Sequence, residues 1–238
     1  MNKKVSVTVL AFLCLLGLWL IKAPAAPAAD ANAGSISGTV KLDGPAPHDA
    51  VIDMSQDPLC KGVNRAETYV VNNGDLANVF VYVKDGLSGT FAPPKEPVTI
   101  TQQGCKYHPH VMGVMAGQEI SVKNDDPTTH NIHPSPQDNR EWNMTQPPNG
   151  PAIEKSFARD EIMLPVKCNI HPWMRMYINV VGNPFYAVTG PDGKYDIKGL
   201  PPGNYTIGFV QEKLGERDEK VTVAAKQNKV ADETFKMP

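Results

Sequence analysis

The sequence has no surplus of basic residues. Its 238 residues include 23 Lys and Arg against 25 Asp and Glu, which gives a formal net charge of −2. Proteins that bind nucleic acid through its phosphates need such a surplus to neutralise them. Nucleic acid is therefore set aside as a partner.

The sequence also lacks any sustained apolar repeat of helical period. It contains 22 Pro and 19 Gly, about one residue in six, which argues against a helical bundle. Short strand-like stretches follow one another from Ser35 onward, each bounded by Gly, Pro, Asn or Asp. Such a pattern is typical of β-sandwiches, so we predict an all-β fold. In the stretch at residues 78–84, valines alternate with Phe80 and Tyr82, which predicts a central strand covered on both faces.

The N-terminus has the features of an export signal. Lys3 and Lys4 precede an uncharged, largely apolar run from Val5 to Ile21, and an Ala/Pro-rich stretch with small-residue cleavage sites follows. We assign residues 1–31 to a signal peptide and linker, and we expect a periplasmic protein. The alternative is an uncleaved segment that anchors the protein in the membrane, because the run lies at the short edge of what spans a bilayer.

Cysteine is scarce, and its number is odd once the signal is removed. Cleavage takes away Cys14 and leaves Cys60, Cys105 and Cys168. An odd number in an oxidising compartment indicates one disulfide and one thiol kept for other chemistry. Cys60 and Cys105 both lie beside Gly-containing turns, and we expect them to pair, although spacing alone leaves the other pairings open. Cys168 is then the candidate for the remaining chemistry.

Donor atoms for a soft metal ion are concentrated in residues 167–176. Cys168, His171 and Met174 form the pattern C-x-x-H-x-x-M, so one tight loop supplies a thiolate, an imidazole and a thioether. Thiolate and thioether stabilise Cu(I), and imidazole suits both copper oxidation states. A plane of two His and one Cys with a weak axial Met suits neither state fully, which favours fast one-electron transfer. A structural zinc site more often uses closed pairs of Cys or His, and an axial Met has no role there.

The central segment resembles a cupredoxin. The stretch CNIHPWM and the upstream stretch KYHPHVMGVMAGQEISVKNDDPTTHN are similar to the ligand regions of blue copper proteins of the amicyanin or plastocyanin type. The resemblance implies a Greek-key β-sandwich over residues 93–183 that binds one copper ion. It implies that His130 is the first ligand and that Cys168, His171 and the axial Met174 complete the site. It further implies that the side chain of Asn131 ties the His loop to the Cys loop.

Other residues compete for these roles. His133 follows His130 by three positions, and on an extended chain the two side chains point to opposite faces, which favours His130. Met176 lies where the chain re-enters a strand, so we assign it to the core. The His- and Met-rich run from His108 to Met115 is assigned to ordinary strand positions, with a second metal site as the alternative.

Pro172 and Trp173 follow His171 in a loop that we expect at the surface. An apolar rim around the outer ligand lets a partner approach closely without binding for long. We therefore predict a docking patch at Pro172 and Trp173, with His171 as the port for electrons. The alternative is that Trp173 packs inward.

The segments on either side of the centre predict a second sandwich. The stretch GPDGKYDIKGLPPGNYTI resembles the carboxypeptidase regulatory-like domain, a small transthyretin-like β-sandwich, whose first strand is similar to GSISGTV at Gly34 to Val40. We assign residues 34–92 to N-terminal strands that form the first part of this split domain, and residues 184–238 to its remainder. The alternative makes the N-terminal strands an extra layer of the central module.

These features predict an exported mononuclear type 1 (blue) copper protein that carries single electrons between redox partners such as a cytochrome or a dehydrogenase. The alternative, motivated by the run from His108 to Met115, is a copper-binding or delivery protein without redox cycling. The sequence has no G-x-S-x-G motif, no trinuclear His-x-His series and no recognisable pair of catalytic carboxylates. A filled four-ligand site also leaves no position for a substrate, so we expect no enzymatic activity. The transthyretin-like module would dock the copper module to a larger complex.

Overall fold

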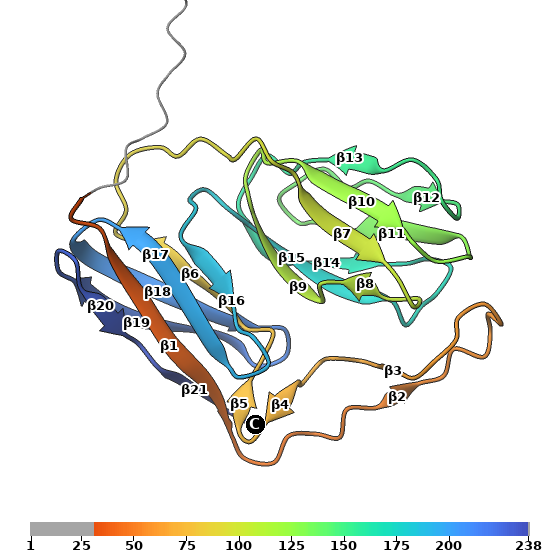
Figure 1. Cartoon of the computed structure of the whole chain (residues 1–238), viewed down its shortest axis with the longest axis horizontal. Helices are drawn as coiled ribbons and strands as arrows, with labels where there is room; N and C mark the ends of the chain where they lie inside the picture. Colours follow the sequence, from red (N-terminus) through yellow and green to blue (C-terminus); the bar gives the residue numbers. More distant parts are fainter. Residues whose placement is uncertain (1–30, 238) are drawn as a thin grey trace, which may run out of the picture.

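The structure, a computed structural model, describes residues 31–237 and consists of strands, turns and loops (Figure 1). These residues contain no helix, and hence none long and apolar enough to cross a membrane. The predicted all-β fold class is confirmed. The apolar run of the predicted export signal lies outside the described residues.

The first sandwich is built from both ends of the chain. Its strands are β1 (Gly34–Asp43), β4 (Val71–Asn72), β5 (Asp75–Leu76), β6 (Phe80–Asp85), β16 (Tyr186–Val188), β17 (Lys194–Leu200), β18 (Gly203–Gln211), β19 (Gly215–Val223), β20 (Asn228–Val230) and β21 (Glu233–Lys236). One sheet has the order β17-β1-β5-β4, with β20 and β21 also paired to β1, and the other has the order β16-β6-β18-β19. Because β1 pairs with β17, β20 and β21, the first strand of the described chain lies among strands from its last part.

The second sandwich is formed by the middle of the chain. Its strands are β7 (Val98–Gln102), β8 (Tyr107–His108), β9 (Val111–Met115), β10 (Ile120–Asn124), β11 (His130–Pro134), β12 (Met144–Gln146), β13 (Ile153–Lys155), β14 (Glu161–Lys167) and β15 (Arg175–Val181). Its two sheets have the orders β13-β10-β7-β8 and β12-β11-β14-β15-β9. Between them lies a core that includes Ile100, Ile120, Ile132 and Ile178, all fully buried.

The strand β6 belongs to the sheet of the first sandwich that faces the second sandwich. Val81 and Val83 face the core of the first sandwich, while Phe80 and Tyr82 belong to a third apolar cluster. That cluster also contains Val111 of β9, so the two sandwiches pack side by side through it (Figure 1). These four side chains are buried, which confirms the prediction of a strand covered on both faces.

A segment at residues 51–65, here called the strap, leaves the first sandwich after β1 and runs to the second. It contains the short antiparallel pair β2 (Val51–Ile52) and β3 (Asn64–Arg65), and Figure 1 shows it in orange below the second sandwich. Met54 and Cys60 of the strap are buried in the core of the second sandwich. Residues 34–92 therefore contribute to both sandwiches.

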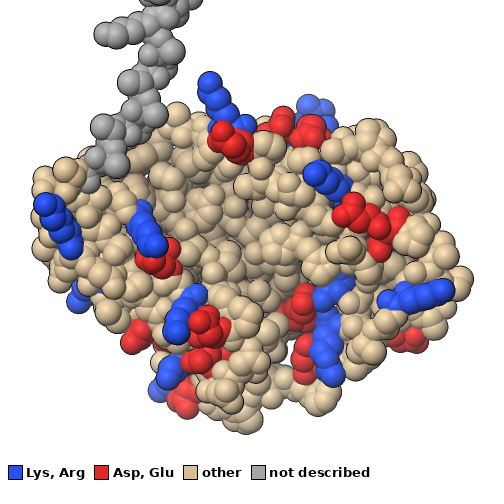
Figure 2. Space-filling view, viewed as in Figure 1, with Lys and Arg blue, Asp and Glu red and all other residues tan. Residues whose placement is uncertain are grey.

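Charges of both signs are interspersed on the face of the molecule shown in Figure 2. Lys84 pairs with Glu216 and Asp218 of β19, and Lys106 pairs with Glu67. These partly exposed pairs add little to stability. No field of one sign dominates this face.

Candidate metal centre

Three of the predicted ligands come together at one end of the second sandwich. His130 begins β11, Cys168 follows β14, and His171 lies in the turn before β15. Their ligand atoms all lie within 4.8 Å of one another. The two Nδ1 atoms are 2.9 Å apart, and Cys168 Sγ is 3.9 Å from His171 Nδ1. All three residues are buried, and they form a group that could hold a metal ion.

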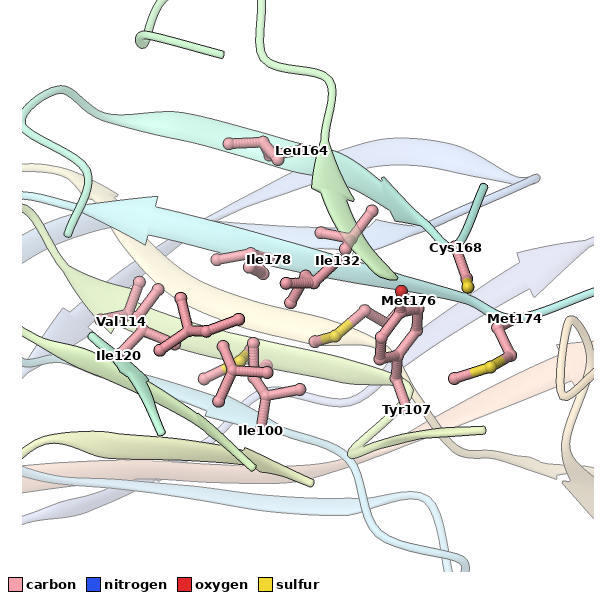
Figure 3. Close-up of a cluster of buried hydrophobic side chains, with 14 of the residues drawn as sticks. Ile100, Tyr107, Val114, Ile120, Ile132, Leu164, Cys168, Met174, Met176 and Ile178 are labelled. Atoms are coloured by element: carbon pink, nitrogen blue, oxygen red, sulfur yellow. The ribbon is translucent and has the colours of Figure 1, made fainter. Parts of the chain in front are cut away.

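Met174 closes the turn that carries two of these ligands. Its N–H donates to the carbonyl of His171 at 2.9 Å, and its carbonyl accepts the N–H of Cys168 at 3.2 Å. The residue is buried in the core of the second sandwich. Figure 3 shows the Met174 thioether and the Cys168 thiol at the same end of this core. The four predicted ligands therefore derive from β11 and from the single turn between β14 and β15.

The partners of the outer ring nitrogens determine where the histidines carry their protons. His130 Nε2 is 2.8 Å from Asp126 Oδ2, and His171 Nε2 is 2.9 Å from Asp57 Oδ2. A carboxylate only accepts hydrogen bonds, so each Nε2 carries a proton. In a neutral ring the Nδ1 atom is then an acceptor.

Two acceptors at 2.9 Å cannot bond to each other, so the space between the Nδ1 atoms calls for a cation. Two nitrogens that each bind one ion at about 2.0–2.1 Å are roughly 3 Å apart, which matches the observed spacing. The two Nδ1 atoms could also form a hydrogen bond with each other if one of the rings carried a second proton, on its Nδ1. At His130 burial opposes this, because it lowers the pKa below the ordinary value of 6.5 in spite of the nearby Asp126. The donor set therefore fits a metal ion.

Two backbone N–H groups point at the sulfur of Cys168. Cys168 is a free, buried cysteine, and Sγ accepts the N–H groups of Asn131 and His171, each at 3.3 Å. The pKa of the neighbouring Tyr107 is raised by burial and further by Cys168, and its hydroxyl donates to the carbonyl of Asn131.

The side chain of Asn131 joins the two loops that carry the ligands. Its Oδ1 accepts the N–H of Asn169 at 3.1 Å, and its Nδ2 donates to Asn143 Oδ1 and to the carbonyl of Met144. These are the contacts that its predicted role requires. They hold the Cys168 turn against β11 by hydrogen bonds within the protein itself.

The competing residues have partners of their own. His133 Nε2 is 2.5 Å from Glu141 Oε1, and its Nδ1 is 3.0 Å from Asn169 Oδ1. Met176 is fully buried in the core of the second sandwich. His133 thus engages side chains other than the predicted ligands, and Met176 packs as expected for a core residue.

The run from His108 to Met115 is divided among different surroundings. His108 Nε2 is 3.1 Å from the carbonyl of Gln103, whereas His110 Nε2 is 2.9 Å from Glu212 Oε2. Met112 and Met115 are buried. Among residues 31–237, the groups of His, Cys and acidic side chains close enough to share an ion include no member of this run.

His171, the predicted port for electrons, is itself buried. Only 2% of its surface is accessible, because Asp57 caps its outer nitrogen and the Trp173 ring lies 5.1 Å from its ring. Of the predicted docking pair, Pro172 is exposed. Trp173 is half-buried, and its Nε1–H donates to the carbonyl of Cys105 at 3.2 Å.

Sequence reasoning missed both carboxylates. Asp126 lies four positions before His130, so an acidic side chain beside a ligand was the available signal. Asp57 lies 114 positions from His171, and its only signal was its closeness to Cys60. The structure contains the disulfide between Cys60 and Cys105, and this bond attaches the strap to the metal end of the second sandwich.

No protein-family model and no curated protein matches this chain. One matching solved structure is a mutant of amicyanin in the Cu(I) state, with 17% identity, a TM-score of 0.32 and coverage of 42% of this chain and 97% of amicyanin. A purple cupredoxin from Nitrosopumilus maritimus matches with 20% identity, a TM-score of 0.30 and coverage of 35% and 98%. The Cu-containing nitrite reductase from Thermus scotoductus SA-01 matches with 20% identity and a TM-score of 0.35.

The reductase match covers 41% of this chain but only 25% of the reductase. All three TM-scores are below 0.5, so these matches leave the function to be decided by the residues of the site. The transthyretin-like resemblance of the outer segments stays a prediction.

Proposed function

We propose that this chain binds one copper ion through His130, Cys168, His171 and Met174 and carries single electrons between redox partner proteins. The observation that supports it is the pair of facing Nδ1 acceptors beside a buried thiol that accepts two N–H groups. Thiolate and thioether stabilise Cu(I), while imidazole suits both Cu(I) and Cu(II). A copper ion held there supplies one-electron redox chemistry.

The protein holds these donors in place through its own hydrogen bonds. Asp126 and Asp57 direct the two rings, and Asn131 joins the two ligand loops. The site is buried in a packed sandwich. A site that changes little between its two charge states exchanges an electron with little rearrangement, so this rigidity suits a carrier.

Pro172 and Trp173 remain our proposed contact for a redox partner, and because His171 is buried, the electron route to it passes through a neighbouring side chain. The Trp173 ring contacts the ring of His171 and is itself half-buried, and Pro172 is exposed beside it. An electron would therefore reach His171 through Trp173. We further propose that the protein is exported to the periplasm and that it turns over no substrate, because four protein ligands fill the site.

Spectra of the copper-loaded chain test this function. We expect an intense visible band from thiolate-to-copper charge transfer, a type 1 EPR signal and reversible one-electron reduction. Cys168→Ala should abolish the band. His133→Ala is the matched control, because it removes a nearby imidazole that engages Glu141 instead, and it should keep the band.

A copper titration separates the carrier from a delivery protein. The carrier saturates at one equivalent and cycles reversibly. Two or more tightly bound Cu(I) equivalents, or a visible band that survives in Cys168→Ala, would contradict the proposal.

A further inference from the structure

The strap brings a carboxylate to the metal centre from outside the sandwich that holds the ligands. Asp57 Oδ2 lies 2.9 Å from His171 Nε2 and also accepts the Thr128 hydroxyl at 2.8 Å. Its other oxygen accepts the N–H of Leu59 at 2.8 Å. Asp57 is thus held by three partners, and one of them lies on the loop that leads to His130.

The strap is fastened close to Asp57. Cys60, three residues further along, is bonded to Cys105. Asn64 Nδ2 donates to the carbonyl of Gly104 at 2.6 Å. The carbonyl of Cys105 accepts the indole N–H of Trp173, the residue two positions after His171. These contacts fix the position of Asp57 relative to the His171 turn.

The two histidines are capped in the same way by carboxylates of different origin. Asp126 caps His130 from within the second sandwich, and its oxygens also accept the N–H groups of Gly104 and Cys105 at 2.6 and 2.8 Å. Asp57 caps His171 from the strap. Asp57 therefore lies close to Cys60 and Asp126 close to Cys105, the two cysteines of the disulfide.

We propose that Asp57 is a positioning residue of the metal centre, which holds the proton of His171 on Nε2, leaves Nδ1 free to bind the ion, and favours the oxidised state by its negative charge. This inference rests on the function proposed above. A carboxylate that accepts the outer N–H of a ligand histidine fixes its tautomer and raises its basicity. A negative charge close to a metal ion also stabilises the more positive of its two charge states.

The reduction potential of the copper-loaded protein tests the charge effect. Asp57→Asn keeps the shape of the side chain and removes the charge. We expect it to raise the equilibrium constant for reduction about tenfold, which corresponds to about 59 mV for a one-electron couple. The control is Asp53→Asn in the same strap, because Asp53 is exposed and its carboxylate accepts hydrogen bonds from Ser55. Both variants change the net charge equally, so the difference between their reduction potentials isolates the effect of the charge beside His171.

The histidine tautomer gives a readout that needs no copper. In the metal-free protein near neutral pH, ¹⁵N NMR should find a proton on Nε2 of His171. Asp57→Ala should produce a mixture of both tautomers, while Asp53→Ala should leave the spectrum of His171 unchanged.

The outcomes distinguish this inference from the function on which it rests. If the wild type binds copper with a thiolate band but Asp57→Asn and Asp53→Asn have the same potential, the role of Asp57 is overturned and the carrier function stands. If the wild type shows no such band, the carrier function fails, and the tautomer experiment alone judges the contact. A wild-type His171 that carries no proton on Nε2 overturns the inference directly.

Discussion

Removal of the disulfide between Cys60 and Cys105 should destabilise the metal-free protein by about 4 kcal/mol. The bond joins residues separated by 45 positions. A cross-link over a loop of this length lowers the entropy of the unfolded chain by about 13 cal/mol/K, or about 4 kcal/mol at 25 °C. Both cysteines are buried in the core of the second sandwich, so the bond also holds the strap against that core.

Urea denaturation of the double variant Cys60→Ala with Cys105→Ala measures this loss. With a slope of roughly 2–3 kcal/mol per molar urea, the midpoint should fall by roughly 1.5 M. The wild type in a thiol reductant should shift in the same direction. Cys168→Ala is the matched control, because it removes a buried thiol without opening a cross-link, and its loss should stay below about 2 kcal/mol.

A loss below about 1 kcal/mol in the double variant, at an unchanged slope, would refute this reasoning. It would mean that the unfolded chain gains little freedom when the bond is absent. The strap would then be held to the second sandwich by its other contacts alone, such as the hydrogen bond from Asn64 to Gly104.

Three further predictions follow. Gly113→Ala should cost about 1–3 kcal/mol in urea denaturation, because its Cβ would lie 2.5 Å from the ring of Tyr186 at the contact between the sandwiches; an unchanged midpoint would count against that contact. Met174→Leu should change metal-free stability by less than about 1.5 kcal/mol yet shift the copper potential, and an unchanged potential would exclude the thioether as a ligand. Burial lowers the pKa of His130, so between the folded and the unfolded pKa this residue is protonated in the unfolded chain and neutral in the folded chain. Metal-free stability should therefore fall as pH drops from about 6.5 toward the folded pKa, with a smaller dependence in His130→Asn.

The sequence predicted those features that depend on local order. The alternation of valines with Phe80 and Tyr82 placed β6 between two apolar layers, because side chains of a strand point to its two faces in turn. The spacing of Cys168, His171 and Met174 placed all three in one turn for a similar reason. Residues that are three positions apart on a tight turn are close in space, whatever the fold of the rest of the chain.

The sequence did not predict the strap, because its position depends on contacts between distant residues. Residues 51–65 contain only two strands of two residues each, so no periodic pattern marks them. What fixes the strap is one covalent bond to Cys105 and polar contacts to Gly104, to the loop before β11 and to the turn before β15. The pairing of Cys60 with Cys105 was expected, but its consequence for Asp57 required the fold of the second sandwich as well.

The burial of His171, the predicted port for electrons, has the same origin and shows what a resemblance can transfer. The ligand set can be inferred from the central segment alone, because every ligand lies within it. Exposure cannot be inferred in this way, because it depends on whatever other part of the chain lies against the site. Here Asp57 comes from residues before that segment, and it both covers His171 and contributes a charge. The same ligand spacing in a chain without a strap would leave the outer nitrogen of this histidine open, so access to the ion and its potential are properties of the whole chain.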